Sequence, residues 1–565
     1  MSIETGDLIS RVYGNFRGVD FRGEEINLSR SPDSLNVWKD YKETESIRTR
    51  PGMELKLAFN DTIYGMFFYN GVMLVHSGTT LYKVVNGAKQ VLYSGVKATP
   101  SNGFIYESVW YFKDGVHYLK YDGKTISEVV GYIPTTSIAR KPTLGLNDTS
   151  GGTIYEEVNM LSNRRINTFI GDGISTCFHL DAQDIDKVRP IAKIDGAELT
   201  DFEVYYDKGI VVFNDLIPYA PQTDGQDNVT IEFQKTVAGH RERILNCSLL
   251  QVFDNRVFFS GNKNFPNTVW HCSLNDPTYC SDLDYYNEGM DAAQIKGLVA
   301  GNNALWVFRE PSESNTNAFY HVPTVDSEYG KIYPSSHSSI TIGCVGKAIN
   351  FNDDIVFFSK RGMEGVSGDI TTEQFAAHRS SLVDRKLIAE PDYENMILEE
   401  WEGYLLVIIG DKVYLADSRT SLNNENHIEY EWFYWQMEKK ITCAKVYDGV
   451  LYLGTADGVY TLTDLTSNIE SYWVTPKDKF KSPHKLKTTN KRGCVVEATG
   501  DISIYAKLED TDFELIGTYE NITDYFVSRI KRKKFKDIQL KFYSKTRFSL
   551  ETATLECFVG GYLKR

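Results

Sequence analysis

Residues 448–453 (Asp-Gly-Val-Leu-Tyr-Leu) and 457–460 (Asp-Gly-Val-Tyr) decide the fold of this chain. Each Asp-Gly pair supplies the positive backbone φ angles that a tight hairpin turn requires. Each pair is followed by a short run of apolar and aromatic residues, which suits a strand packed into a sheet. The stretch therefore predicts a turn, a strand, a second turn and another strand.

The same pattern recurs along the chain. Close copies occur at residues 70–75 (Asn-Gly-Val-Met-Leu-Val) and 114–119 (Asp-Gly-Val-His-Tyr-Leu), and looser copies begin at residues 254, 302, 353 and 402. The turn residues at 70, 114, 254, 302, 353, 402 and 448 are separated by gaps of 44, 140, 48, 51, 49 and 46 residues. Five of the six gaps match the roughly 40–50-residue period of a propeller blade. We therefore predict an all-β protein built on a β-propeller of about seven blades.

The gap of 140 residues indicates an inserted domain. Residues 166–233 contain several strand-like runs of their own, flanked by polar segments that contain glycine. After residue 470 the blade pattern stops, and the run at 538–542 alternates as a sheet with one buried face does. We predict five parts: an N-terminal arm (1–53), a first propeller segment (54–163), an inserted small β domain (164–238), a second propeller segment (239–470) and a C-terminal β-sandwich (471–565).

Composition limits the function. The chain has 76 Asp and Glu against 61 Lys and Arg, and its net charge of −15 argues against general nucleic-acid binding. No run approaches the roughly 20 apolar residues of a membrane helix, and the N-terminus lacks the apolar core of a secretory signal. We therefore expect no membrane-spanning segment and synthesis in a cytoplasm. The eight cysteines include no CxxC pair, so we expect buried thiols rather than a zinc or redox site.

The sequence contains no recognisable catalytic signature. It has no GxSxG, HExxH, P-loop or dinucleotide-binding glycine motif. His76 and His117 stand alone within predicted strands, where a packed or surface imidazole is the simpler interpretation. The acidic pairs at 353–354 and 399–400 lie at predicted turns or loop edges, where solvated carboxylates are normal. We predict that the protein is not an enzyme and has no catalytic residue, no metal site and no cofactor.

The N-terminal arm is the first candidate interface. Arginine and aromatic side chains are the usual anchors of protein interfaces, and the arm carries Arg17, Arg22, Arg30, Arg48, Arg50, Phe16, Phe21, Trp38 and Tyr41. A segment that cannot bury these groups on itself should bury them on an adjacent subunit or a neighbouring ring. The predicted interface residues of the arm are Arg17, Phe21, Arg30, Trp38, Arg48 and Arg50. The alternative is that the arm closes the propeller by donating a strand to the last blade.

The basic run at residues 529–536 is the second candidate interface, through Arg532, Lys533 and Lys534. The functional interpretation is contact with a protein partner, with contact to DNA phosphates as a smaller share. The alternative is a solvated edge strand, because lysine on an edge discourages aggregation.

Three motifs of the arm resemble the start of a known protein family. They are F-x-G-V-D at 16–20, S-R-S-P-D-x-x-N at 29–36 and R-x-R-P-G at 48–52. The tail nozzle and stabilisation proteins of short-tailed bacteriophages open in a similar way, before a β-propeller. Residues 255–261 (Asn-Arg-Val-Phe-Phe-Ser-Gly) and 535–542 are similar to propeller and sandwich segments of the same family.

The resemblance implies a structural component of a tailed-phage virion, assembled in the host cytoplasm and placed in the tail or the head–tail neck. Such proteins form a homo-oligomeric ring, often of six copies, in contact with neighbouring neck and tail proteins. Genomic DNA would pass acidic walls during ejection without sequence-specific binding. The alternative is a propeller that binds a host-surface glycan or protein receptor. A glycoside hydrolase is a weaker alternative, because it needs two paired carboxylates that the sequence does not offer.

Overall fold

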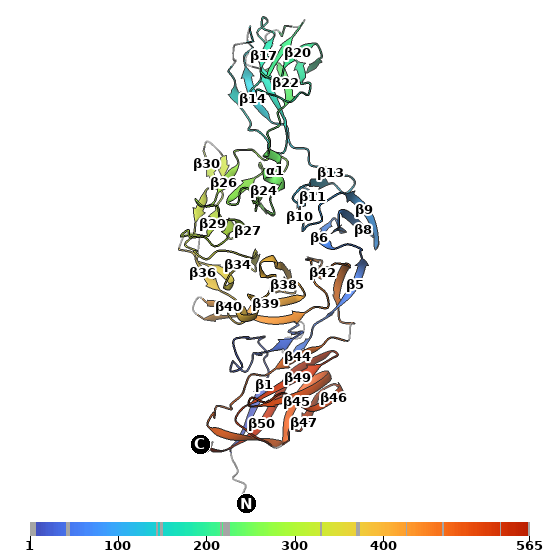
Figure 1. Ribbon diagram of the computed structural model, residues 1–565, viewed down its shortest axis with the longest axis vertical. Coiled ribbons are helices and arrows are strands. Elements are labelled where there is room, and N and C mark those ends of the chain that lie inside the picture. The colour runs from blue at the N-terminus through green and yellow to red at the C-terminus, as the bar shows by residue number, and fades with distance from the viewer. Residues whose placement is uncertain are drawn as a thin grey trace, which may run out of the picture. The chain divides into compact units, whose positions relative to one another are not determined.

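The computed structural model describes residues 7–40, 46–142, 145–146, 151–214, 217–218, 226–327, 330–368, 373–424, 427–465, 468–531 and 533–562. The protein is all-β, as predicted (Figure 1). In these ranges, helical structure is limited to α1 (His240–Leu245), α2 (Asp384–Leu387) and the 3₁₀ turn η1 (Tyr393–Asn395). No helix in the described ranges is long and apolar enough to span a bilayer.

Seven four-stranded antiparallel sheets of the described chain form the blades of a β-propeller, which confirms the predicted fold class (Figure 1). The strands of the first four blades are β6 (Ile63–Tyr69), β7 (Val72–Ser77), β8 (Thr80–Val85) and β9 (Ala88–Ser94); β10 (Asn102–Tyr106), β11 (Val109–Lys113), β12 (Tyr118–Tyr121) and β13 (Ile126–Glu128); β23 (Leu249–Phe253), β24 (Arg256–Ser260), β25 (Thr268–His271) and β26 (Tyr285–Asn287); and β27 (Ile295–Gly301), β28 (Ala304–Arg309), β29 (Ala318–His321) and β32 (Ser335–His337). Between β29 and β32 the chain forms a small hairpin of β30 (Thr324–Asp326) and β31 (Gly330–Ile332).

The strands of the last three blades are β33 (Ala348–Phe351), β34 (Asp354–Ser359), β35 (Gly362–Ser367) and β36 (Phe375–His378); β37 (Ile397–Trp401), β38 (Tyr404–Ile409), β39 (Lys412–Asn424) and β40 (His427–Gln436); and β41 (Cys443–Tyr447), β42 (Val450–Gly454), β43 (Gly458–Thr463) and β5 (Gly52–Ala58). The fourth strand of the last blade therefore comes from the N-terminal part of the chain. In its register Gly52 lies opposite Thr463, and Ala58 lies opposite Gly458.

The repeated turn residues form the first hairpin of six blades. Asn70 and Gly71 have φ angles of 48° and 77°, and Asp448 and Gly449 have φ angles of 49° and 75°, as tight hairpin turns require. The copy at residue 114 lies one hairpin later than predicted. There the Asp114 carboxylate accepts hydrogen bonds from the backbone N–H groups of Val116 and His117, between β11 and β12.

The inserted domain has a core of its own. Its larger sheet has the order β15-β14-β16-β22-β18-β19, and its smaller sheet has the order β17-β21-β20. The buried residues of this core all lie between Phe169 and Phe233. The strands are β14 (Thr135–Arg140), β15 (Thr153–Ile154), β16 (Arg164–Phe169), β17 (Cys177–His179), β18 (Ile191–Ile194), β19 (Ala197–Leu199), β20 (Phe202–Tyr205), β21 (Ile210–Phe213) and β22 (Val229–Gln234). Because β14 and β15 belong to this sheet, the domain begins before the predicted boundary at 164.

The C-terminal domain is one hydrogen-bonded sheet of 11 strands, and the N-terminal arm supplies four of them. The strands are β44 (Ser471–Val474), β45 (Lys485–Leu508), β46 (Glu514–Ile522), β47 (Tyr525–Ser528), β48 (Lys534–Phe535), β49 (Ile538–Ser544), β50 (Phe548–Tyr562), β1 (Asp7–Tyr13), β2 (Ser34–Leu35), β3 (Val37–Trp38) and β4 (Ile47–Thr49). The long strand β45 pairs with β50 along most of its length and with β49 only after Gly500. Buried residues of β45, β49 and β50 belong to one hydrophobic core, which also includes residues of blades 6 and 7. A two-layered sandwich stays a prediction.

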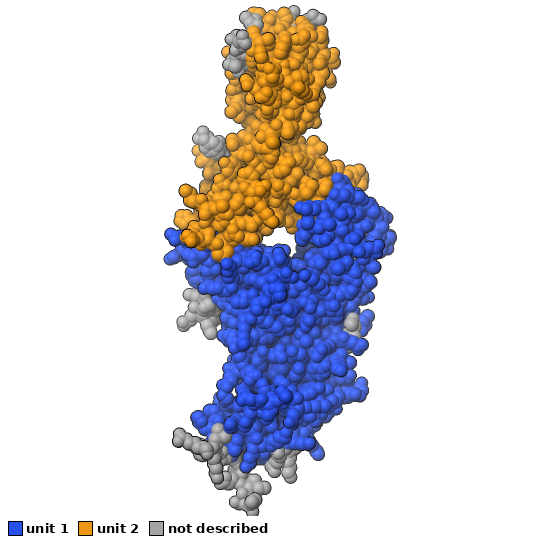
Figure 2. Space-filling view, in the orientation of Figure 1, with its two compact units in different colours: residues 1–100, 315–318, 338–565 blue, residues 101–314, 319–337 orange. Residues whose placement is uncertain are grey.

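Two compact units divide the chain (Figure 2). One contains residues 1–100, 315–318 and 338–565, and the other contains residues 101–314 and 319–337. The C-terminal sheet, the N-terminal arm and blades 1, 5, 6 and 7 belong to the first unit. The inserted domain and blades 2 to 4, apart from Ala318, belong to the second.

Candidate functional site

The aromatic residues of the arm are buried within the same chain. The Phe16 ring meets the Trp473 ring edge-on, with 5.0 Å between the centroids. Trp38 is 3% exposed and stacks on Trp401 with a centroid distance of 5.3 Å. Phe21 is half-buried and meets Tyr434 edge-on at 6.0 Å. The arm thus occupies the space between blade 6 and strand β44.

Most arginines of the arm also have partners in the same chain. Arg17 forms an ion pair with Glu431, and Arg48 forms one with Asp40. Arg50 is fully buried, and its Nε donates to Asn36 Oδ1 at 2.9 Å while its Nη2 lies 2.9 Å from Glu438 Oε1. Desolvation by burial lowers the pKa of Arg50 from its usual value.

The premise of the arm prediction is therefore wrong: the arm does bury these groups on its own chain. The physical reason is that its strands complete a sheet whose other strands lie more than 400 residues away, as the pairing of β1 with β50 shows. The alternative, that the arm donates a strand to the last blade, holds only for the last residues of the arm, because the closing strand β5 begins at Gly52. Contact of the arm with another subunit stays a prediction.

Arg30 differs from the other arginines of the arm. Its side chain is 4% exposed, and within the described chain its buried Nη1 atom has no hydrogen-bond partner. Burial lowers the pKa of Arg30 from the usual arginine value, although the carboxylates of Glu431 and Glu429 act in the opposite direction.

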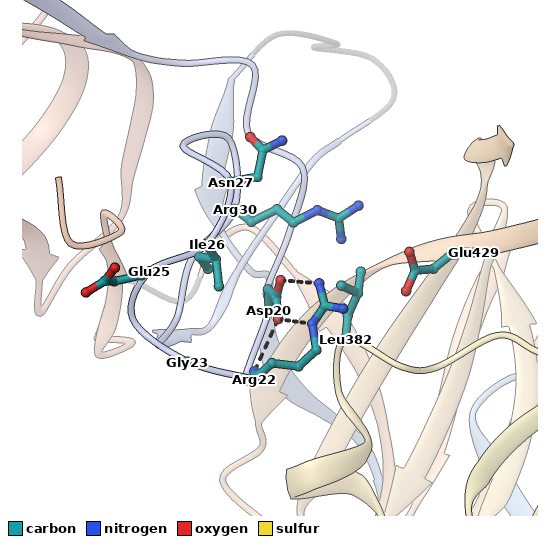
Figure 3. Close-up of a pocket in the computed structure, with 9 residues that line it drawn as sticks. All are labelled: Asp20, Arg22, Gly23, Glu25, Ile26, Asn27, Arg30, Leu382 and Glu429. Atoms are coloured by element: carbon teal, nitrogen blue, oxygen red, sulfur yellow. Dashed lines mark hydrogen bonds and ion pairs between the residues drawn. The ribbon is translucent and has the colours of Figure 1, made fainter. Parts of the chain in front are cut away.

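A pocket of about 410 Å³ opens beside Arg30 (Figure 3). The arm forms one wall, and Leu382 and Glu429 form the other. Arg22 is held inside this pocket by Asp20, whose carboxylate oxygens lie 2.8 and 2.9 Å from the guanidinium nitrogens (Figure 3). The hydrogen bond to Asp20 raises the pKa of Arg22. The lining residues are Asp20, Arg22, Gly23, Glu25, Ile26, Asn27, Arg30, Leu382 and Glu429.

The basic run at 529–536 lies at an edge of the C-terminal sheet. Arg532 falls outside the described residues. Lys533 is exposed and its Nζ lies 2.8 Å from Glu514 Oε2, whereas Lys534 is exposed in the short strand β48. Because the described pairing of β48 is with β45 alone, this placement fits the solvated edge strand. Contact of Lys533 and Lys534 with a partner stays a prediction.

The remaining candidates from the sequence have structural partners. His76 is buried, with its Nε2 3.1 Å from the Gly78 carbonyl oxygen, and Asp354 pairs with Arg379 at 2.9 Å. Glu399 lies 3.2 Å from Lys445. All eight cysteines are thiols, and burial raises the pKa of Cys247 to about 12. Within the described ranges, no group of three His, Cys, Asp or Glu side chains could hold a metal ion.

Sequence reasoning missed a charged cluster around His378. Its Nδ1 lies 3.2 Å from Glu364 Oε1, and its Nε2 lies 2.6 Å from Asp384 Oδ2. Burial lowers the pKa of His378, but the hydrogen bonds to Asp384 and Glu364 outweigh it and raise the pKa to about 9. The imidazole is therefore charged at neutral pH. No sequence motif links these residues, since three separate elements bring them together.

Comparisons with known proteins do not show a family for this chain. No family model and no curated protein matches it. Among solved structures, BamB from Moraxella catarrhalis is 11% identical, with 78% of this chain and 94% of that chain covered and a TM-score of 0.32. The computationally designed Ika8 protein is 11% identical, with 72% and 97% covered and a TM-score of 0.32. Hsv2 of Kluyveromyces lactis is 6% identical, with 75% and 95% covered and a TM-score of 0.31. Likenesses at this level say nothing about function.

Proposed function

We propose that this protein is a structural subunit of a tailed-phage virion, forming a ring around the DNA channel in the tail or head–tail neck, and that it is not an enzyme. One observation carries the proposal. The arm residues through which the sequence resembles nozzle and stabilisation proteins form a joint between domains of the chain.

The first motif, at residues 16–20, fastens the arm to blade 6. The Val19 N–H donates to the Trp432 carbonyl oxygen at 2.7 Å. Gly18 has a φ of +77°, and a Cβ there would lie 2.9 Å from the Trp432 carbonyl carbon, closer than real Cβ contacts. Only glycine fits this approach of two backbones. The Asp20 N–H donates to the Ser31 carbonyl oxygen at 2.8 Å, which ties the first motif to the second.

The second motif fastens the arm to strand β44 and the residue before it, and the third motif is tied to the second. Ser31 Oγ donates to the Val474 carbonyl oxygen at 2.7 Å, and Asn36 Nδ2 donates to the Glu470 carbonyl oxygen at 2.8 Å. Arg50 of the third motif donates to Asn36. The three motifs together couple the last blades of the propeller to the C-terminal sheet. Such coupling suits a structural subunit, because it keeps the domains of each copy together when the copies pack into a ring.

The test is the assembly state of the purified full-length protein, measured by mass photometry and negative-stain imaging. We expect closed rings with cyclic symmetry at the highest soluble concentration, because a closed ring buries the same two faces of every subunit. A monomer at every concentration, with no rings in the images, would contradict the proposal.

The alternative function is a propeller protein that binds a host-surface glycan or protein. The inserted domain favours it, because Ile154 and Ile174 expose 79% and 67% of their surface. Exposed apolar side chains of this kind serve binding surfaces when they cluster. A monomer that binds saturably to a glycan array or to host cells would select this alternative over the ring.

A further inference from the structure

Arg30 carries a buried positive charge, and one of its N–H groups has no hydrogen-bond acceptor within the described chain. A guanidinium stays protonated in proteins and carries five N–H donors but no acceptor. The Nη1 atom of Arg30 is buried and unpartnered within the described chain. Burying an ionised donor without an acceptor is unfavourable, so the folded chain gains stability if something binds there.

The carboxylates around Arg30 already have other donors. Asp20 is 1% exposed and is held by Arg22. Glu431 forms its ion pair with Arg17, and Glu429 accepts a hydrogen bond from Ser381. The Arg30 guanidinium reaches into the gap between the arm and the strand of Glu429, whereas that of Arg22 is turned onto Asp20 (Figure 3).

The charges of the pocket select the kind of anion. Two cations, Arg22 and Arg30, face three carboxylates, Asp20, Glu25 and Glu429. The guanidinium fork suits both carboxylate and phosphate, but the lining carboxylates repel a phosphate dianion about twice as strongly as a carboxylate, which brings a single charge. We propose that this pocket is a binding site for a carboxylate group, with Arg30 as its principal donor.

Two sources could supply the carboxylate: a small free acid, or an Asp or Glu side chain of a second copy of this chain. The site itself depends only on the surroundings of Arg30. Supply by a second copy rests on the ring proposed above. The net charge of −15 makes carboxylates plentiful on such a copy.

The experiment uses acetate as the probe on the full-length protein. Binding is followed by ligand-observed NMR of the acetate methyl resonance, with chloride replacing acetate to keep ionic strength constant. We expect saturable line broadening with the wild type, its loss in Arg30→Met and its weakening in Arg30→Lys, which keeps the charge but not the fork. The matched control Arg164→Met, at an arginine already paired with Glu232, should keep the wild-type response. Circular dichroism checks that each variant folds. If Arg30→Met does not fold, the test rests on Arg30→Lys.

Three outcomes would overturn the carboxylate site. One is the absence of saturable acetate binding to the wild type. Another is unchanged binding in a folded Arg30 variant. The third is tighter binding of inorganic phosphate than of acetate, because the lining carboxylates should exclude a dianion.

A competing arrangement inside the chain is tested by melting curves. Glu431 Oε2 also lacks a hydrogen-bond partner within the described chain, so Arg30 could turn onto it instead of a ligand. If the pocket binds carboxylate, acetate should raise the Tm of the wild type but not that of Arg30→Met. An internal pair would leave both Tm values unchanged by acetate, which contradicts the proposal.

Mass photometry separates the two sources. If a second copy supplies the carboxylate, acetate should weaken the wild-type rings, and the Arg30→Lys variant should form weaker rings than the wild type. Rings that withstand both would assign the site to a free acid. Acetate binding by a protein that forms no rings would leave the site standing while the proposed function fails.

Discussion

His378 has a protonation state set by its two carboxylate neighbours. Its folded-state pKa of about 9 lies above the ordinary value of 6.5. A raised pKa contributes stability that is fully present below about pH 6.5 and is lost as the pH rises through 9. We expect His378→Asn to lower the free energy of unfolding by about 2–3 kcal/mol at pH 6 and by little above pH 9.5.

Urea unfolding of the wild type and of His378→Asn across pH 6 to 9.5 measures this difference. His484→Asn is the matched control, because that imidazole is exposed. A difference between wild type and His378→Asn that does not change with pH would show that the imidazole acts through packing and not through its charge.

At the scale of elements, the arm depends on close approach of its backbone to blade 6. Gly18 and Gly449 have nearly equal φ angles of 77° and 75°, but open space surrounds Gly449. Gly449→Ala should cost about 1–2 kcal/mol, which is the strain of a Cβ at positive φ. Gly18→Ala should cost about 2 kcal/mol more, because its Cβ also collides with the Trp432 carbonyl group. Urea unfolding of both variants measures the costs, and equal losses would show that the arm does not pack as described.

At the scale of the whole molecule, the inserted domain should be removable if the cuts follow its sheets. The Lys235 N–H donates to the Asn163 carbonyl oxygen at 2.7 Å, so the two ends of the cut at residues 164–234 are adjacent. The Glu156 N–H likewise donates to the Thr135 carbonyl oxygen at 3.1 Å. Residues 155–163 must stay, because Met160 and Leu161 belong to the core of the blades.

We expect that deleting both 164–234 and 136–154, each replaced by two glycines, leaves a soluble protein with cooperative melting. The comparison is deletion of 164–234 alone, which leaves β14 without its partner β16 and should aggregate more. Size-exclusion chromatography and thermal melting report the result. Loss of cooperative melting in the double deletion would show that the domain is integral to the propeller.

The predictable part of the fold depends on local signals. The turns at Asn70-Gly71 and Asp448-Gly449 mark blades because positive φ angles and the strand that follows are properties of neighbouring residues. The Asp-Gly signature at Asp114 predicts the wrong hairpin because Asp-Gly also suits other tight turns, as the hydrogen bonds of the Asp114 carboxylate show. The first hairpin turn of that blade is Glu107-Ser108, which carries no turn signature in the sequence.

The sequence by itself determined the all-β class, the approximate number of blades and the presence of an insertion. Only the tertiary structure decided where the arm goes. Its partners Glu431 and Trp473 lie more than 400 residues away, and no periodic pattern records such a pairing. Only the tertiary structure showed that Arg30 differs from Arg17, Arg48 and Arg50. The difference is whether the buried guanidinium has an acceptor, and the folded chain decides which acceptors lie near it.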